Sequence, residues 1–415
     1  MRNKSILNRD YALLLLLFVV FILIRSVNFN HFFSFVYDQA NFSTSALEIF
    51  RDRKVQLIGP SISINLGGRE IFQGGIIYYF FLIFLLLGHF DPKLSTYLFI
   101  FFSGLMIVPL YYGIKLMHSK NDAIFMSILY AIFPIYIHGT MSLWNPHFQF
   151  ALTPILLYLM GIYKVTKRRA IFFALSFFAG FLLQFHYQYI VVILGLFIYY
   201  FLIKKLGIRN IPIFILGLAL GFSPMILFEL RNKFYNLNTI LLFLSHYKDV
   251  FGKGNPIGAN VHYFLSISLF LFMAIGSILR NQLNKIKLIC IFVVLLTWST
   301  LLYVIFPSEN SVVKDWSYDD ELKVYNIIKN STITNYNISS FYNATATTQK
   351  YFLKRDEIRI NFDDYRSNKY LYVIYYKDVD FKTNRAYEMN TFNPSIVIKK
   401  WQINEKYDLI LSQRI

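Results

Sequence analysis

Cysteine is nearly absent from this chain. Its one cysteine, Cys290, lies inside an apolar run, which excludes a disulfide framework and a cysteine-based metal site. Walker-type phosphate loops, dinucleotide-binding glycine turns and HExxH zinc motifs are missing as well. The sequence therefore offers no ATP site, and we expect no cofactor, with a metal requirement left open.

Acidic residues are scarce before Pro307. Residues 1–306 hold 9 Asp and Glu against 25 Lys and Arg, whereas residues 307–415 hold 14 against 16. Most of the net charge of +18 therefore belongs to the first 306 residues, which are also the apolar ones. We interpret the excess as the topology signal of a membrane protein rather than as a nucleic-acid-binding surface.

Long hydrophobic runs extend from residue 11 to residue 306. The chain is 56% hydrophobic with a mean hydropathy of +0.46, which is too apolar for a soluble globular protein. Because a membrane span needs about 20 apolar residues, we expect about nine spans. They are residues 11–29, 94–114, 121–140, 147–163, 170–185, 188–203, 211–229, 261–279 and 288–306.

Basic turns give the predicted orientation in the cell membrane. With the N-terminus cytoplasmic and the short run 75–90 not crossing, 15 Lys and Arg fall in cytoplasmic segments and the turns 141–146 and 186–187 hold none. If 75–90 crossed, 12 of those 15 would move outside, so the positive-inside rule favours the first arrangement. We therefore expect a re-entrant or interfacial helix at 75–90 within an outer loop 28–93. The uncharged stretch 170–203 then turns near 184–188.

Asp38 is the first candidate for chemistry. It lies in the aromatic stretch HFFSFVYDQANF just after the first span, where a carboxylate is costly and usually has a function or a partner. Partial desolvation would raise its basicity, as a general base requires. The structural alternative is that Asp38 is the N-cap of a helix over 39–50. The local context leaves both open.

Two arginines are candidates for binding phosphate, which an arginine can hold through paired donors. Arg231 lies with Glu229 in FELRNKF at the outer end of a span, and Arg25 lies near the outer end of the first span. Each also has a structural alternative. Glu229 and Arg231 could pair to anchor the helix end, and Arg25 could be an interface anchor whose head reaches the surface.

The two uncharged outer turns each carry a histidine beside aromatic or amide groups. SLWNPHF supplies Trp144, Asn145 and His147, and the second turn supplies His186 and Tyr187. Such groups suit stacking on sugar rings and hydrogen bonding to them. Taken singly, each is better explained by structure, because Trp and Tyr are common at membrane interfaces and Asn-Pro at turns. Together they favour a binding role.

These segments together resemble a known family. The aromatic-Asp stretch resembles the first-outer-loop motif of GT-C membrane glycosyltransferases. The segments IGPSIS…FQGGIIYYF, SLWNPHF, LLQFHYQ and LFELRNKF resemble those of the dolichyl-phosphate-mannose protein mannosyltransferase and lipid A aminoarabinose transferase group. The resemblance covers most of residues 1–306. Two positions depart from the pattern: Gln39 stands where many members have Glu, and Gly75 replaces a Pro.

The resemblance implies a GT-C-like polytopic helical domain over 1–306 that transfers a sugar, with inversion, from a polyprenyl-phosphate donor. The acceptor would be a glycan, lipid or protein on the outer face. Asp38 would deprotonate the acceptor hydroxyl, and Arg231 and Arg25 would hold the donor phosphate. The substrate-contact candidates are Gln39, Tyr78, Trp144, Asn145, His147, His186, Tyr187 and Glu229.

Residues 307–415 read as a small extracytoplasmic α/β domain. YLYVIYYKD, SIVIKKW and YDLILSQRI predict strands, and DDELKVYNIIKN predicts an amphipathic helix. Whether this domain binds the acceptor or only caps the membrane part is left open. A transporter or flippase of lipid-linked glycans is the main alternative function, but such proteins show internal repeats, and none is found. A polymerase or ligase would place its key loop late in the chain.

Overall fold

The chain divides into two compact units. The computed structural model describes residues 2–27, 29–66, 68–245, 264–279, 293, 296–297, 299–300, 315–340, 346–358, 364–378 and 387–415. The first unit combines Met1–Asn28 with Lys54–Phe306, and the second combines Phe29–Arg53 with Pro307–Ile415. The short segment after the first long helix thus belongs to the same unit as the C-terminal segment.

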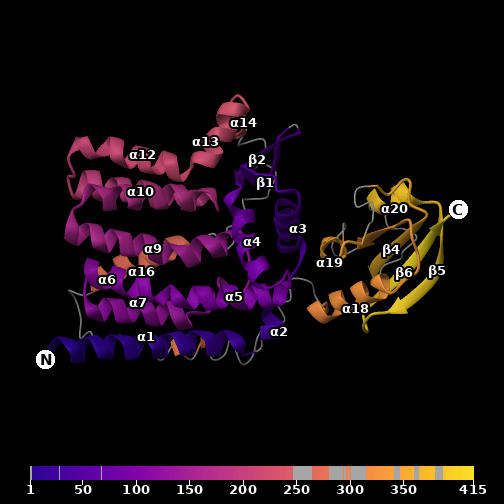
Figure 1. The fold of residues 1–415 in the computed structure, drawn as a ribbon, viewed down its shortest axis with the longest axis horizontal. Coiled ribbons are helices and arrows are strands. Elements are labelled where there is room, and N and C mark those ends of the chain that lie inside the picture. The colour runs from indigo at the N-terminus through magenta and orange to yellow at the C-terminus, as the bar shows by residue number, and fades with distance from the viewer. Residues whose placement is uncertain are drawn as a thin grey trace. The chain divides into compact units, whose positions relative to one another are not determined.

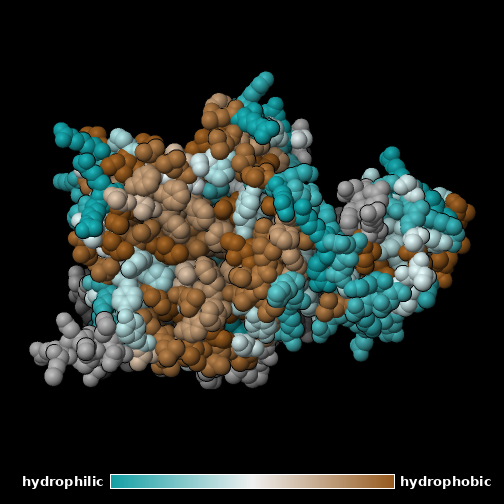
Figure 2. Space-filling model, in the orientation of Figure 1, coloured by the Kyte–Doolittle hydropathy of each residue, from teal (hydrophilic) through white to brown (hydrophobic). Residues whose placement is uncertain are grey.

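Helices dominate the first unit. They are α1 (Arg2–Ser26), α4 (Ile76–Leu87), α5 (Pro92–Leu105), α6 (Ile107–Met117), α7 (Lys120–Ile132), α8 (Pro134–His138), α9 (Asn145–Thr166), α10 (Arg169–Leu183), α11 (Ile190–Phe197), α12 (Ile211–Gly221), α13 (Ser223–Arg231), α14 (Tyr235–Ser245) and α16 (Leu265–Leu279). Six of them pack side by side in the order α12, α10, α9, α6, α7, α1 (Figure 1). Apolar residues cover most of their visible face (Figure 2).

Two described helices are long and apolar enough to cross a membrane: the nearly continuous Pro92–Met117 and α9. A third is present if Ile208–Gly221 and α13, which meet at a 75° bend, form one span. The nine predicted spans are therefore not confirmed, and the run 288–306 lies largely outside the described residues. Prolines account for two breaks, since Pro134 begins α8 and Pro224 lies in the first turn of α13.

A β-hairpin that the sequence analysis did not anticipate precedes α4. Strand β1 (Ile58–Leu66) pairs antiparallel with β2 (Arg69–Gly74), with Gly68 in the turn at a φ of +84°. The hairpin explains Gly75, where the resembled family has proline. The Gly75 N–H donates to the Leu57 carbonyl at 3.1 Å, a bond that proline could not make. The predicted short helix over 75–90 is present as the twelve residues of α4.

The second unit is a four-stranded sheet with helices. Its elements are α2 (Phe29–Phe32), α3 (Tyr37–Asp52), α18 (Tyr318–Lys329), β3 (Tyr336–Ser340), α19 (Thr347–Arg355), β4 (Tyr370–Tyr376), α20 (Tyr387–Phe392), β5 (Ser395–Gln402) and β6 (Tyr407–Arg414). The strand order is β3-β4-β6-β5, with β3 parallel to β4 and the other pairs antiparallel. The predicted strands β4, β5 and β6 and the predicted helix α18 are all confirmed.

Candidate active site

Hydrogen bonds gather β2 and the uncharged turns at one end of the helical layer. Asn145, at the start of α9, donates from Nδ2 to Gln73 Oε1 at 2.7 Å and to the Phe185 carbonyl at 3.2 Å. The Gly74 N–H donates to the Gln184 carbonyl at 2.9 Å. The turns 141–146 and 184–188 therefore meet the strand before α4. The predicted turn after α10 is confirmed.

The start of α14 joins the same cluster through Asn236. The Phe72 N–H donates to Asn236 Oδ1 at 2.9 Å, and Asn236 Nδ2 donates to the Phe72 carbonyl at 2.7 Å and to Tyr187 Oη at 3.0 Å. The Tyr187 hydroxyl donates to the Phe72 carbonyl. We call these residues, with Gln73, Asn145 and Gln184, the neutral cluster, because it is built from amides, a phenol and backbone groups.

The basic turns meet at the other end of the helices, where charged groups replace the uncharged ones. Lys115 and Lys120 approach the buried Asp10 carboxylate, with Nζ–Oδ distances of 2.6 and 2.7 Å, and Lys164 donates to the Met117 carbonyl. Burial raises the pKa of Asp10, but the two lysines outweigh it and hold that pKa at about 2. The basic and the uncharged turns thus separate to opposite ends of the helices (Figure 1).

The two histidines of the uncharged turns differ in their surroundings. His147 is buried, with Nδ1 at 2.8 Å from Ser142 Oγ, and its ring lies edge-on to Trp144 with centroids 5.4 Å apart. His186 is half-buried, and its Nδ1 accepts from the Gln188 N–H at 3.4 Å. Gln149 of α9 donates to the His186 carbonyl at 3.0 Å. The histidine turns are therefore tied together through α9.

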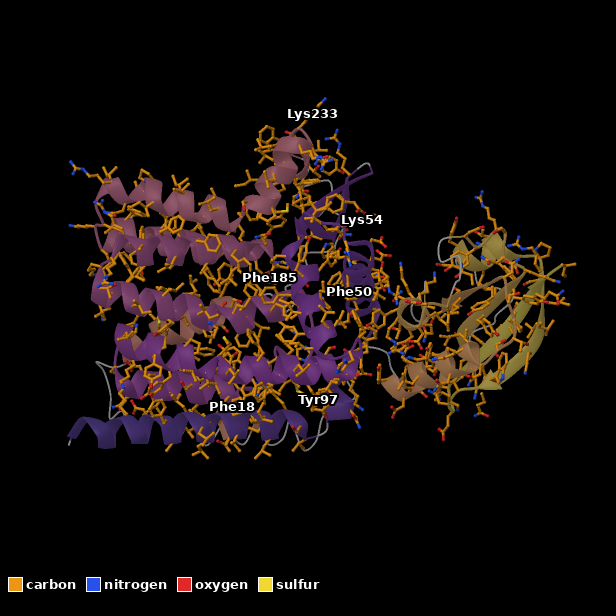
Figure 3. All side chains as sticks on the ribbon, viewed as in Figure 1. Phe18, Phe50, Lys54, Tyr97, Phe185 and Lys233 are labelled. Carbon is orange, nitrogen blue, oxygen red and sulfur yellow. The ribbon has the colours of Figure 1, made fainter. Side chains whose placement is uncertain are left out.

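Aromatic rings pack directly behind the neutral cluster. Phe185 contacts Phe80, Phe181 and Phe148 with ring centroids 5.1, 5.6 and 6.1 Å apart, and it lies among α4, α9 and α10 (Figure 3). Tyr78 on α4 is buried as well. This packing leaves the polar groups of the cluster at a border between apolar side chains and the turns.

Arg25 is fully buried within the first unit. Its guanidinium donates to Thr140 Oγ1 at 2.6 Å and to the carbonyls of Phe21, Ala131 and Tyr136 at 3.2, 2.8 and 3.2 Å. It also lies 3.3 Å from the centroid of the Phe21 ring. Carbonyls of α1, of α8 and of the last turn of α7 thus compensate the buried charge. These contacts favour a structural anchor over a phosphate ligand, although the anchor is buried and does not reach the surface.

Glu229 and Arg231 do not pair. In the part of the chain that the structure describes, no ion pair joins them. Both Glu229 oxygens instead accept from the first turn of α14, from the N–H groups of Asn236 and Leu237 at 3.1 Å each. Arg231 is exposed at the end of α13, next to the turn from whose tip Lys233 projects (Figure 3). Its side chain is accessible to an anionic ligand.

Asp38 lies in the first turn of α3. The helix begins at Tyr37 after the N-cap Val36, so the structural alternative, with Asp38 as the N-cap of a helix over 39–50, is wrong. Asp38 is half-buried, and the neighbouring Gln39 is buried. A carboxylate in the first turn is stabilised by the partial positive charge of the helix N-terminus. Both residues belong to the second unit.

Helix α3 packs along α19 of the C-terminal segment. Near the start of both helices, Thr348 Oγ1 donates to the Phe35 carbonyl at 2.9 Å. Near its end, the Arg51 guanidinium donates to the carbonyls of Lys354 and Arg355 at 2.5 and 2.7 Å, and Lys354 pairs with Glu48. The helix that carries Asp38 is therefore clamped at both ends by the C-terminal segment. Only the amphipathic pattern of α3, with its buried face over 39–49, could have pointed to a partner.

The comparisons leave the family open. In the described ranges, no three His, Cys, Asp or Glu side chains gather as metal ligands. No family model matches the chain, and no curated protein matches it. The resemblance to GT-C enzymes therefore depends on the motifs alone.

Proposed function

We propose that this chain is a membrane glycosyltransferase that moves a sugar from a polyprenyl-phosphate donor to an acceptor hydroxyl. The observation that carries the proposal is the neutral cluster. It unites β2 and the uncharged turns at the end of an apolar helical layer, away from the basic turns. A lipid-linked sugar needs such a place, with apolar surface for its tail and neutral polar groups for its sugar.

The separation of charge supports the predicted orientation. Under the positive-inside rule, the end that holds Lys115, Lys120 and Lys164 faces the cytoplasm. The neutral cluster then lies on the extracytoplasmic side of the cell membrane. This placement matches a donor that is presented on the outer leaflet.

The proposed reaction needs one base and one phosphate holder. Asp38 takes the proton of the acceptor hydroxyl, the acceptor oxygen bonds to the anomeric carbon, and the bond from that carbon to the phosphate oxygen breaks. Polyprenyl phosphate leaves with the bonding electrons, and the anomeric configuration inverts. Arg231 is the accessible cation for the leaving phosphate, where stabilising the developing charge speeds the reaction. Arg25 has no such role here, because its donors are used within the unit.

The other candidate residues divide by their accessibility. Asn145, Tyr187 and Glu229 hold the turns together through the bonds described above, so we assign them positioning roles. Trp144 and His186 are half-buried and remain the better candidates for contacting sugar. His147 is buried and its ring packs against Trp144, whereas Tyr78 and Gln39 are buried within the first and the second unit respectively.

The decisive test is turnover by purified protein in lipid vesicles given a panel of polyprenyl-phosphate sugars. The proposal predicts release of free polyprenyl phosphate together with a glycosylated acceptor for at least one donor. A transporter or flippase would move the donor between leaflets with the sugar–phosphate bond intact. Movement without bond cleavage across the whole panel would refute the proposal.

A further inference from the structure

The second unit contains a pocket of about 740 Å³ that the proposed reaction does not use. Ligand sites in proteins typically measure about 300–1,000 Å³, so its size suits a few sugar residues. Helix α18, the turn that follows it and strand β5 form its lining. The pocket lies wholly within one compact unit of the chain.

Helix α18 presents two different faces. Val324, Tyr325 and Ile328 are buried in the unit, whereas Lys323 and Asn326 are exposed and line the pocket. The turn adds Asn330, Ser331 and Thr332 to the lining. Amides and hydroxyls are directional donors and acceptors of the kind that bind sugar hydroxyls.

Strand β5 supplies an aromatic platform. Trp401 is half-buried, with its ring centroid 6.1 Å from that of Tyr372. The Tyr372 hydroxyl donates to Ser331 Oγ at 2.8 Å, which fixes the turn relative to the platform. The Lys399 ammonium lies 4.9 Å from the Trp401 centroid. The second lysine of the lining, Lys323, instead donates a hydrogen bond to the Ile403 carbonyl.

We propose that this pocket binds an oligosaccharide that bears an acidic group. The face of an indole ring packs against the C–H face of a pyranose. The neighbouring amides and hydroxyls donate hydrogen bonds to the sugar hydroxyls and accept hydrogen bonds from them. Two lysines against one carboxylate, Asp319, leave the lining with a net positive charge, and Lys399 is placed to pair with a carboxylate or phosphate on that sugar, a charge-assisted contact. A peptide that paired with strand β5 would bind through backbone groups and would not depend on these side chains.

The glycan bound here is the acceptor, or a neighbouring part of it. This second statement depends on the proposed transferase function, whereas binding itself does not. Binding and transfer are therefore measured separately, so that failure of one is distinguished from failure of the other.

Calorimetry on the full chain tests the binding. The protein is held in lipid nanodiscs, because the sugar head group of a maltoside detergent would compete. Trigalacturonic acid and neutral maltotriose serve as probes. We expect trigalacturonic acid to bind and Trp401→Ala to weaken it at least tenfold, while Tyr387→Ala, an exposed aromatic of α20 outside the pocket, leaves it unchanged. Lys399→Gln should weaken trigalacturonic acid several-fold and remove its preference over maltotriose.

Three results would overturn the assignment. They are no binding of either trisaccharide, binding that Trp401→Ala does not change, and equal binding of the acidic and neutral probes by the unsubstituted protein. Thermal unfolding of each variant accompanies the titrations. If Trp401→Ala lowers the unfolding temperature, Asn326→Ala on the exposed face of α18 must give the same loss of affinity.

Discussion

The Arg51 guanidinium donates to the Lys354 carbonyl at 2.5 Å and so joins the last turn of α3 to the last turn of α19. These residues are about three hundred positions apart in the sequence. The bond places a cation at the end of α19, where the helix dipole favours it. Through it, the C-terminal segment holds the helix that carries Asp38 in its first turn.

Arg51→Gln should therefore destabilise the second unit by about 1–2 kcal/mol, at the low end for hydrogen bonds of charged groups because Arg51 is exposed to solvent. We expect a lower unfolding temperature and slower sugar transfer, because α3 is released from α19. Arg53→Gln, two residues further along and exposed, is the matched control. Equal unfolding temperatures for the two variants would show that the Arg51 contacts do not hold α3.

Substitution of the two candidate phosphate arginines should change different properties, stability for Arg25 and use of the donor for Arg231. Arg25→Gln leaves buried carbonyls without a charged donor and should lower stability by about 3 kcal/mol. Arg231→Gln should leave the unfolding temperature unchanged and lower kcat/KM for the donor about tenfold, which corresponds to about 1.4 kcal/mol, because the leaving phosphate loses its cation. Thermal unfolding and donor kinetics of both variants check this. An unchanged kcat/KM in Arg231→Gln removes that residue from the phosphate site.

Orientation can be measured by cysteine labelling in a Cys290→Ser background, because the chain has no other cysteine. Tyr37→Cys and Asn238→Cys, both at exposed positions, should react with a membrane-impermeant maleimide on intact cells. Arg168→Cys, in a basic turn, should react only after permeabilisation. The reverse pattern would place the neutral cluster in the cytoplasm and contradict the proposal.

Asp356 links α18 to the end of α19 and should make stability depend on pH. Burial raises its pKa, but hydrogen bonds from Arg355, Lys329 and Tyr325 outweigh this and lower the pKa in the folded protein. A lowered folded pKa stabilises the protein above the unfolded value of about 3.9, and this contribution is lost as the pH falls through the folded pKa. Asp356→Asn should therefore lower the unfolding temperature at pH 7, with the difference shrinking below about pH 4. An unfolding-temperature difference between the two proteins that is as large below about pH 4 as at pH 7 would contradict this.

Local patterns predicted much of the fold. Short runs rich in Val, Ile, Leu and Tyr indicate β4, β5 and β6, and helical spacing indicates α18, because each pattern depends on neighbours in sequence. The hairpin β1–β2 was missed although Gly67 and Gly68 stand between two strand-like runs, a recognised hairpin signal. The uniform hydropathy of residues 211–229 predicts one continuous span, whereas Pro224 and the bend at Phe222 divide it.

The site was less predictable because its contacts are long-range. The uncharged turns could be grouped from charge alone, but Asn236 and Gln73 carry no distinguishing local signal and were missed. The packing of α3 on α19 depends on matching two amphipathic helices far apart in the chain, which one sequence does not reveal. Arg25 shows the same limit, since burial decides its role and burial is a property of the fold.

The most direct measurement compares sugar transfer by the unsubstituted protein, Asp38→Asn and the matched control Asp52→Asn at the other end of α3. With the donor that the unsubstituted protein turns over, Asp38→Asn should reduce transfer by about 10²–10⁴-fold, the usual contribution of a general base. Its expression and unfolding temperature should stay close to normal, and Asp52→Asn should remain active. Full transfer by Asp38→Asn would contradict the account.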